Sequence, residues 1–157
     1  MPELGTRMAW AIHTETTVEA DAAAVWRVLT DFSAYDEWNP TLVRARGSAE
    51  IGERLRLYHS LPTGLGVPFR PRVTVVEPER ELRWRVTVGS VLAAEHVVSI
   101  VPTDGRGDRV RLVQREEVEG PLAVPAMGLL GGAIREGLEA MNDALATRVE
   151  ARTGDID

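Results

Sequence analysis

The chain has 157 residues, of which 44% are apolar and 27% are charged, with a formal net charge of −6 and no Cys. This size and composition are typical of one soluble globular domain, and the lack of Cys excludes disulfides, thiol nucleophiles and Cys-ligated metals. The negative charge argues against nucleic acid as the main partner, because phosphate binding needs a basic surface. No apolar run approaches the roughly 18 residues of a membrane span, and no signal-peptide pattern is present. We therefore expect a cytoplasmic protein.

The first expected elements are a strand and a short helix. Residues Trp10–Val18 are rich in β-branched side chains, which favour a strand. Asp21 then offers the carboxylate of a helix N-cap. Val25, Leu29 and Phe32 follow with the spacing of one helical face.

Five further segments alternate apolar and polar residues with a period of two. This pattern is typical of antiparallel strands that bury one face and expose the other. Turn-forming residues separate most of the segments. They lie at 54–59, 72–76, 82–88, 94–100 and 110–119.

A long amphipathic helix is expected from about residue 126 to residue 152. Its apolar side chains recur every three or four residues, at Met127, Leu130, Ile134, Leu138, Met141, Leu145 and Val149. The only large apolar surface that can cover this stripe is the inner face of the sheet, so the expected fold class is α+β. Residues 1–8 and 153–157 are expected to be loose tails of a single domain over residues 9–152.

The chain resembles the START-like superfamily (SRPBCC), which includes polyketide cyclases and aromatases. The resemblance covers nearly the whole chain and is carried by VWRVLTDFSAYDEWNP, EHVVSIVP, RLVQREEVEG and the final helix. It implies a helix-grip fold, in which a curved antiparallel sheet of about seven strands wraps around one long C-terminal helix. A short helical excursion follows the first strand, and a deep cavity lies between sheet and helix. Members bind apolar ligands, cyclise polyketides or bind other proteins.

Four polar residues occupy inward positions of the expected strands: His59, His96, Gln114 and Glu116. A buried polar group without a partner costs roughly 1–3 kcal/mol, so each must meet another polar group, a water or a ligand. One interpretation is that they hold the polar end of an apolar ligand, or that His96 and Glu116 act as general acid and base in a cyclisation or dehydration. The alternatives are a structural network, or a solvated Glu116 at the rim.

The expected ligand contacts come from all walls of the cavity. They are Trp38, Leu57, His59, Trp84, His96, Val98, Gln114, Glu116, Met127, Leu130 and Ile134. For Trp38 and Trp84, packing in the core is the alternative role. Segment 61–68 is either an ordinary hairpin loop or a flap over the cavity mouth.

No metal or cofactor is expected. His59, His96 and Glu116 are the ligand types of a two-His, one-carboxylate site, but they lie on separate strands without the short spacing that supports one. The glycines of GLLGG have no preceding strand and no phosphate-binding Lys, so they are not a nucleotide loop.

Three functions are compatible with these features. The first is binding of a small hydrophobic or aromatic ligand, such as a lipid, a quinone or a polyketide. The second is a cofactor-free polyketide cyclase, aromatase or dehydratase that uses His96 and Glu116. The third is a protein-interaction module that docks through the segment VWRVLTDFSAYDEWNP at 25–40, which we call the Trp-rich segment, or through an exposed apolar loop. Homodimer formation is left open.

Overall fold

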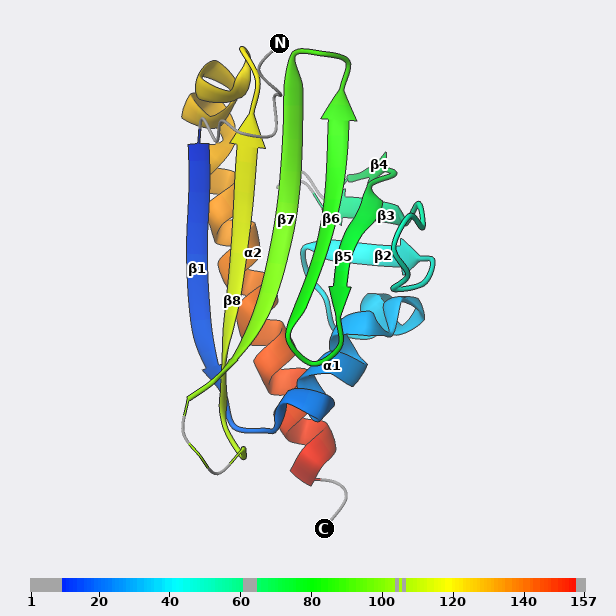
Figure 1. Ribbon diagram of the computed structural model, residues 1–157, viewed down its shortest axis with the longest axis vertical. Helices are drawn as coiled ribbons and strands as arrows, with labels where there is room; N and C mark the ends of the chain where they lie inside the picture. Colours follow the sequence, from blue (N-terminus) through cyan, green and yellow to red (C-terminus); the bar gives the residue numbers. More distant parts are fainter. Residues whose placement is uncertain (1–9, 61–64, 104, 106, 155–157) are drawn as a thin grey trace.

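The computed structural model describes residues 10–60, 65–103, 105 and 107–154. Eight strands, two α-helices and one 3₁₀ helix lie within these residues (Figure 1). In chain order they are β1 (Trp10–Val18), α1 (Ala22–Thr30), η2 (Phe32–Glu37), β2 (Leu42–Arg46), β3 (Arg56–Ser60), β4 (Gly66–Phe69), β5 (Arg72–Glu77), β6 (Glu81–Val88), β7 (Leu92–Pro102), β8 (Val110–Glu119) and α2 (Ala123–Gly154). The α+β class and the long C-terminal helix are confirmed.

The strands form two antiparallel sheets. The larger sheet has the order β1-β8-β7-β6-β5 and the smaller one has the order β2-β3-β4. An isolated bridge between Arg54 and Arg72 connects the chain before β3 to the first residue of β5. The small sheet therefore lies beside the β5 edge of the large sheet (Figure 1).

Two strands of the small sheet were not expected from the sequence. In β2 a register irregularity between Leu42 and Arg44 breaks the alternation. β4 has only four residues and includes Pro68, and proline is tolerated there because β4 is an edge strand. The segment 61–68, interpreted as a loop or a flap, thus contributes residues 66–68 to β4, while residues 61–64 lie outside the described residues.

The first helix begins where the sequence predicts. The Asp21 carboxylate accepts a hydrogen bond of 2.8 Å from the backbone N–H of Ala24, which confirms Asp21 as the N-cap. Val25 and Leu29 are fully buried on the inner face of α1. Phe32 and Tyr35 continue this buried surface in η2, whereas Trp26 and Trp38 are only partly buried.

The long helix is longer at both ends than the apolar stripe predicts. It begins at Ala123 and tolerates Pro125 because this residue lies in the first turn, where a missing backbone N–H costs no hydrogen bond. It ends at Gly154, two residues into the expected tail. The helix packs on β1 and β8 and crosses behind the large sheet (Figure 1). In the part of the chain that the structure describes, no helix is both long enough and apolar enough to cross a membrane.

The core consists of two apolar clusters with polar residues between them. Along β8, Leu112 belongs to the larger cluster and Val118 to the smaller one. Along α2, Met141 and Leu145 belong to the larger cluster, and Leu138 belongs to the smaller one. The inward-facing polar residues of β8 and α2 lie at this boundary. The candidate site lies beside them.

Candidate functional site

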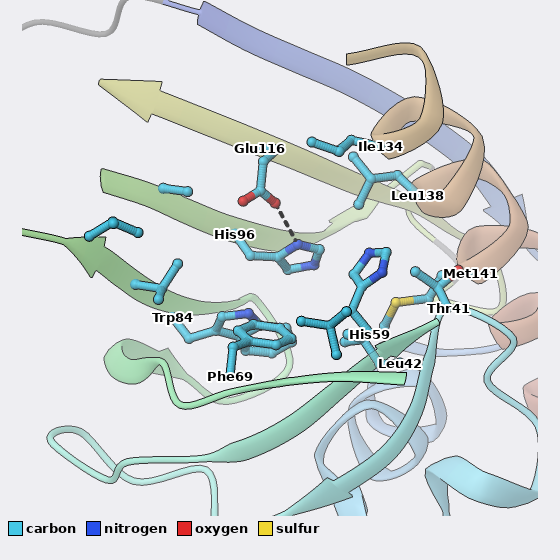
Figure 2. A pocket seen from close by; sticks show the side chains of 14 residues that line it. Thr41, Leu42, His59, Phe69, Trp84, His96, Glu116, Ile134, Leu138 and Met141 are labelled. Carbon is cyan, nitrogen blue, oxygen red and sulfur yellow. Dashed lines mark hydrogen bonds and ion pairs between the residues drawn. The ribbon is translucent and has the colours of Figure 1, made fainter. Parts of the chain in front are cut away.

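A cavity of about 330 Å³ lies between the two sheets and α2 (Figure 2). Apolar side chains make up most of its wall, and four polar residues interrupt them. The lining residues are Thr41, Leu42, His59, Val67, Phe69, Trp84, Val86, Val88, Ala94, His96, Glu116, Ile134, Leu138 and Met141. A small concave site with apolar walls and a few converging polar groups is typical of ligand pockets.

A second space of about 480 Å³ adjoins the cavity between the small sheet and α2. Thr41, His59, Val67 and Ile134 line both spaces. The second space is also lined by Leu130, Ala133, Glu136, Gly137 and Ala140 along α2, and by Pro40 and Ser60. We call it the outer groove.

Strand register brings the aromatic and acidic residues of the cavity together. His96 on β7 is the direct register partner of Trp84 on β6 and of Glu116 on β8. Because register partners on neighbouring strands share a face of the sheet, the three side chains lie in one row across the cavity wall. The two residues proposed as a catalytic pair, 20 positions apart in the sequence, are thereby adjacent.

Both ring nitrogens of His96 have partners. Nδ1 lies 3.0 Å from Glu116 Oε2 (Figure 2). Nε2 lies 2.8 Å from Gln114 Oε1. The imidazole is also stacked on the Trp84 indole, with ring centroids 4.6 Å apart and an angle of 6° between the planes. His96 is therefore fixed from three sides.

The hydrogen bonds continue from His96 to the long helix and the first strand. Gln114 Nε2 donates to Asn142 Oδ1 at 2.7 Å, and Asn142 Nδ2 donates to Thr14 Oγ1 at 2.8 Å. The Thr14 hydroxyl donates to the backbone carbonyl of Gln114 at 3.0 Å. Thr14, Gln114 and Asn142 are all buried. This polar network joins β7, β8, β1 and α2 at the boundary between the two apolar clusters.

The backbone carbonyl at the end of the network determines the direction of every bond. A carbonyl can only accept, so the Thr14 hydroxyl must donate to it and must accept from the Asn142 amide. Asn142 Oδ1 then accepts from the Gln114 amide, which leaves Gln114 Oε1 as an acceptor. His96 Nε2 consequently carries a proton.

Because His96 Nε2 carries a proton, the number of protons between His96 Nδ1 and Glu116 Oε2 can also be inferred. Two bare lone pairs at 3.0 Å would repel, so one proton must lie between Nδ1 and Oε2. The pair is either imidazolium with carboxylate or imidazole with carboxylic acid, and both forms have no net charge. The pair thus holds one exchangeable proton at the cavity wall.

His59 enters the cavity from the small sheet. Its Nδ1 lies 2.9 Å from the backbone carbonyl of Ser60, so Nδ1 carries the proton and Nε2 is an acceptor in the neutral ring. The imidazole of His59 reaches toward the same space as that of His96 (Figure 2). No group of three His, Asp or Glu side chains within the described residues is placed to hold a metal ion.

The structure brings five of the expected ligand contacts to the cavity wall and a sixth to the outer groove. His59, Trp84, His96, Glu116 and Ile134 line the cavity. Leu130 lines the outer groove.

The other five expected contacts lie behind the wall. Leu57 and Val98 are fully buried in the larger cluster, and Met127 packs in the smaller one. Gln114 lies behind His96, and Trp38 packs edge-on against Tyr35 at 5.1 Å. Alternation identifies the inward face of a strand, but it does not show how far along the strand a cavity extends.

Several lining residues were missed because they belong to elements that the pattern did not reveal. Leu42, Val67 and Phe69 come from β2 and β4 of the small sheet. Thr41 precedes β2, and its hydroxyl donates to the backbone carbonyl of Gly137 at 2.6 Å. Thr14 and Asn142 were missed as network members, although Asn142 follows the stripe residue Leu138 by four positions and precedes Leu145 by three.

Comparison with known proteins places the chain in a family. The family described as polyketide cyclase / dehydrase and lipid transport matches residues 9–150. The chain belongs to this family. The match covers all the described strands and most of α2, and it confirms the START-like resemblance.

Solved structures agree with this assignment. A START superfamily protein from Mycobacterium smegmatis is 26% identical, with a TM-score of 0.70 over 90% of this chain and 97% of that one. The Zhui aromatase/cyclase from Streptomyces sp. R1128 is 19% identical, with a TM-score of 0.74 over 92% and 95%. A point mutant of norcoclaurine synthase from Thalictrum flavum, in complex with a transition state analogue, is 18% identical, with a TM-score of 0.69 over 92% and 96%. None of the curated proteins compared matches the chain.

Proposed function

We propose that this family member binds a small, mostly apolar molecule in the cavity between the two sheets and α2. The observation that carries the proposal is the combination of an apolar wall with polar groups that converge on one space of about 330 Å³. Ligand pockets of this kind span about 300–1,000 Å³. The family description, which includes lipid transport, supports a ligand of low polarity.

Among the expected contacts, we propose that His59, Trp84, His96, Glu116 and Ile134 touch the ligand. Trp84 on β6 and Phe69 on β4 provide aromatic surface, and His59 comes from β3 of the same small sheet as Phe69 (Figure 2). Leu130 would be met by a ligand long enough to extend into the outer groove. A cytoplasmic location and the formation of a homodimer are still predictions from the sequence.

Titration with the neutral fluorescent probe N-phenyl-1-naphthylamine tests this proposal. Its emission rises when it leaves water for an apolar site. We expect saturable binding with one probe per chain, because one apolar cavity adjoins one apolar groove. A linear, non-saturating rise in emission, equal to that with the urea-unfolded chain, would contradict the proposal.

A cofactor-free cyclase or dehydratase is the second candidate function, favoured by the single proton between His96 and Glu116. Such a pair can take a proton from a carbon beside a carbonyl group and return one to an oxygen. The aromatase/cyclase among the structural neighbours is consistent with this candidate. If the chain turns over a poly-β-keto substrate, we expect Glu116→Gln to lower the rate by about 10²-fold or more, whereas unchanged turnover would exclude this role for Glu116.

A further inference from the structure

The side chains that line the cavity offer mostly hydrogen-bond acceptors. Thr41, His59 and His96 each donate a proton to a protein acceptor, and the one proton between His96 and Glu116 is shared within that pair. The acceptor character of the wall therefore follows from the hydrogen bonds within the protein and does not depend on a ligand.

His59 presents an acceptor because its proton is used elsewhere. Nδ1 donates to the carbonyl of Ser60 at 2.9 Å, which leaves the Nε2 lone pair of the neutral ring facing the cavity. In the described part of the chain, the bond from Nδ1 to Ser60 is the one hydrogen bond found for the His59 ring, and none is found for Nε2.

Glu116 presents an acceptor in either form of its pair with His96. The shared proton lies between Oε2 and Nδ1, so Oε1 is either half of a carboxylate or the carbonyl oxygen of a carboxylic acid. Both accept hydrogen bonds. The hydroxyl of Thr41 donates to Gly137, so its oxygen is a third acceptor.

Donors and positive charges are scarce on the same wall. The indole N–H of Trp84 is the one side-chain donor there for which no hydrogen bond is found among the described residues. All 18 basic residues of the chain are Arg, and no Arg is among the lining residues of the cavity or the outer groove. An anionic ligand would therefore bury its charge against three acceptors, and His96, which can be cationic, is already paired with Glu116.

We infer that the ligand is a neutral aromatic molecule with a hydroxyl group, and that His59 Nε2 accepts the proton of that hydroxyl. A phenolic hydroxyl donates to His59 and can accept from Trp84, whereas an ether or a carboxylate can only accept. The aromatic rings of Phe69 and Trp84 suit the apolar body of such a ligand. This inference rests on the proposed function and specifies the chemical class of its ligand.

Three naphthalenes of similar size test the inference by displacement of N-phenyl-1-naphthylamine. We expect 2-naphthol to bind about five- to tenfold more tightly than 2-methoxynaphthalene, which corresponds to one net hydrogen bond. We expect 2-naphthoate to bind at least about 100-fold more weakly than 2-naphthol, because its charge is unpaired in the cavity.

His59→Phe and His13→Phe form a matched pair for the role of His59. His13 is exposed and pairs with Glu15 outside the cavity. We expect His59→Phe to reduce the preference for 2-naphthol over 2-methoxynaphthalene to less than about twofold, and His13→Phe to keep it. The preference is the ratio of the affinities for 2-naphthol and 2-methoxynaphthalene within one variant. A smaller folded fraction in that variant therefore does not change the ratio.

The outcomes separate this inference from the proposed function. If the probe binds but 2-methoxynaphthalene or 2-naphthoate binds as tightly as 2-naphthol, the ligand class is wrong and the binding function stands. If His59→Phe keeps the full preference, the assignment of His59 is overturned. If the probe itself does not bind, both the inference and the proposed function fail.

Discussion

Replacement of Gln114 by Leu is expected to lower the free energy of unfolding by about 2–4 kcal/mol. Leucine keeps the size of the side chain but removes both partners that Gln114 provides. His96 Nε2–H and Asn142 Oδ1 then remain buried without hydrogen bonds, and each costs about 1–3 kcal/mol. Urea unfolding followed by circular dichroism measures the difference.

The variant Asn142→Leu and the double variant provide the control for this prediction. If both residues act in one network, their combined cost is smaller than the sum of the single costs by about 1 kcal/mol or more. Additive losses, or a loss below about 0.5 kcal/mol for Gln114→Leu, would show that the polar network does not support the fold in this way.

Replacement of Ala94 by Phe is expected to weaken binding of N-phenyl-1-naphthylamine by more than about tenfold, which equals about 1.4 kcal/mol. Ala94 lines the cavity from β7, beside His96 and between the register partners Val86 and Val118. The added ring occupies the space of the ligand with apolar atoms and leaves the polar network intact. The free energy of unfolding should change by less than about 1.5 kcal/mol. Fluorescence titration and urea unfolding of the same preparation measure both quantities.

Ala11→Phe is the matched control for Ala94→Phe. Ala11 lies on β1 of the same sheet, but it is exposed and does not line the cavity. We expect Ala11→Phe to bind the probe like the unsubstituted chain. Equal loss of binding in the two variants, or none in Ala94→Phe, would place the probe somewhere other than this cavity.

The sequence predicts much of the large sheet because most residues on one face of its strands are apolar and most on the other are polar, although Val97 and Val113 on the second face are also buried. Leu82 and Trp84 on β6 alternate with arginines, and their register partners Val98 and His96 on β7 lie on the same face of the sheet. The strongest departures from the apolar pattern, at His96, Gln114 and Glu116, are the residues that the structure joins by hydrogen bonds. A polar residue on an apolar face needs a hydrogen-bond partner. For this reason the contact between His96 and Glu116 could be predicted from the sequence.

The small sheet was less predictable because local pattern carries little information about it. β2 contains a register irregularity, and β4 is a four-residue edge strand. Its position beside β5 depends on contacts between distant segments, such as the bridge from Arg54 to Arg72. The outer wall of the cavity, with Val67 and Phe69, therefore could not be assigned before the structure.

The Trp-rich segment illustrates the same limit for single residues. Helical spacing correctly predicts that Val25, Leu29 and Phe32 are core. Trp38 follows η2, where that spacing no longer applies, and it packs against Tyr35 away from the cavity lining. Burial of Tyr35 raises the pKa of its phenol well above the usual range, and its hydroxyl donates to the carbonyl of Leu29. The aromatic cluster therefore stabilises α1 and η2.

Intermolecular nuclear Overhauser effects from bound 2-naphthol to the methionine methyl groups test the central claim most directly. Met141 lines the cavity, whereas Met127 packs in the smaller apolar cluster outside it. With ¹³C-methyl-labelled methionine, the proposed function predicts effects to the methyl group of Met141 and none to that of Met127. Effects to Met127 alone, or to neither methyl group at saturating ligand, would contradict binding in the cavity between the sheets and α2.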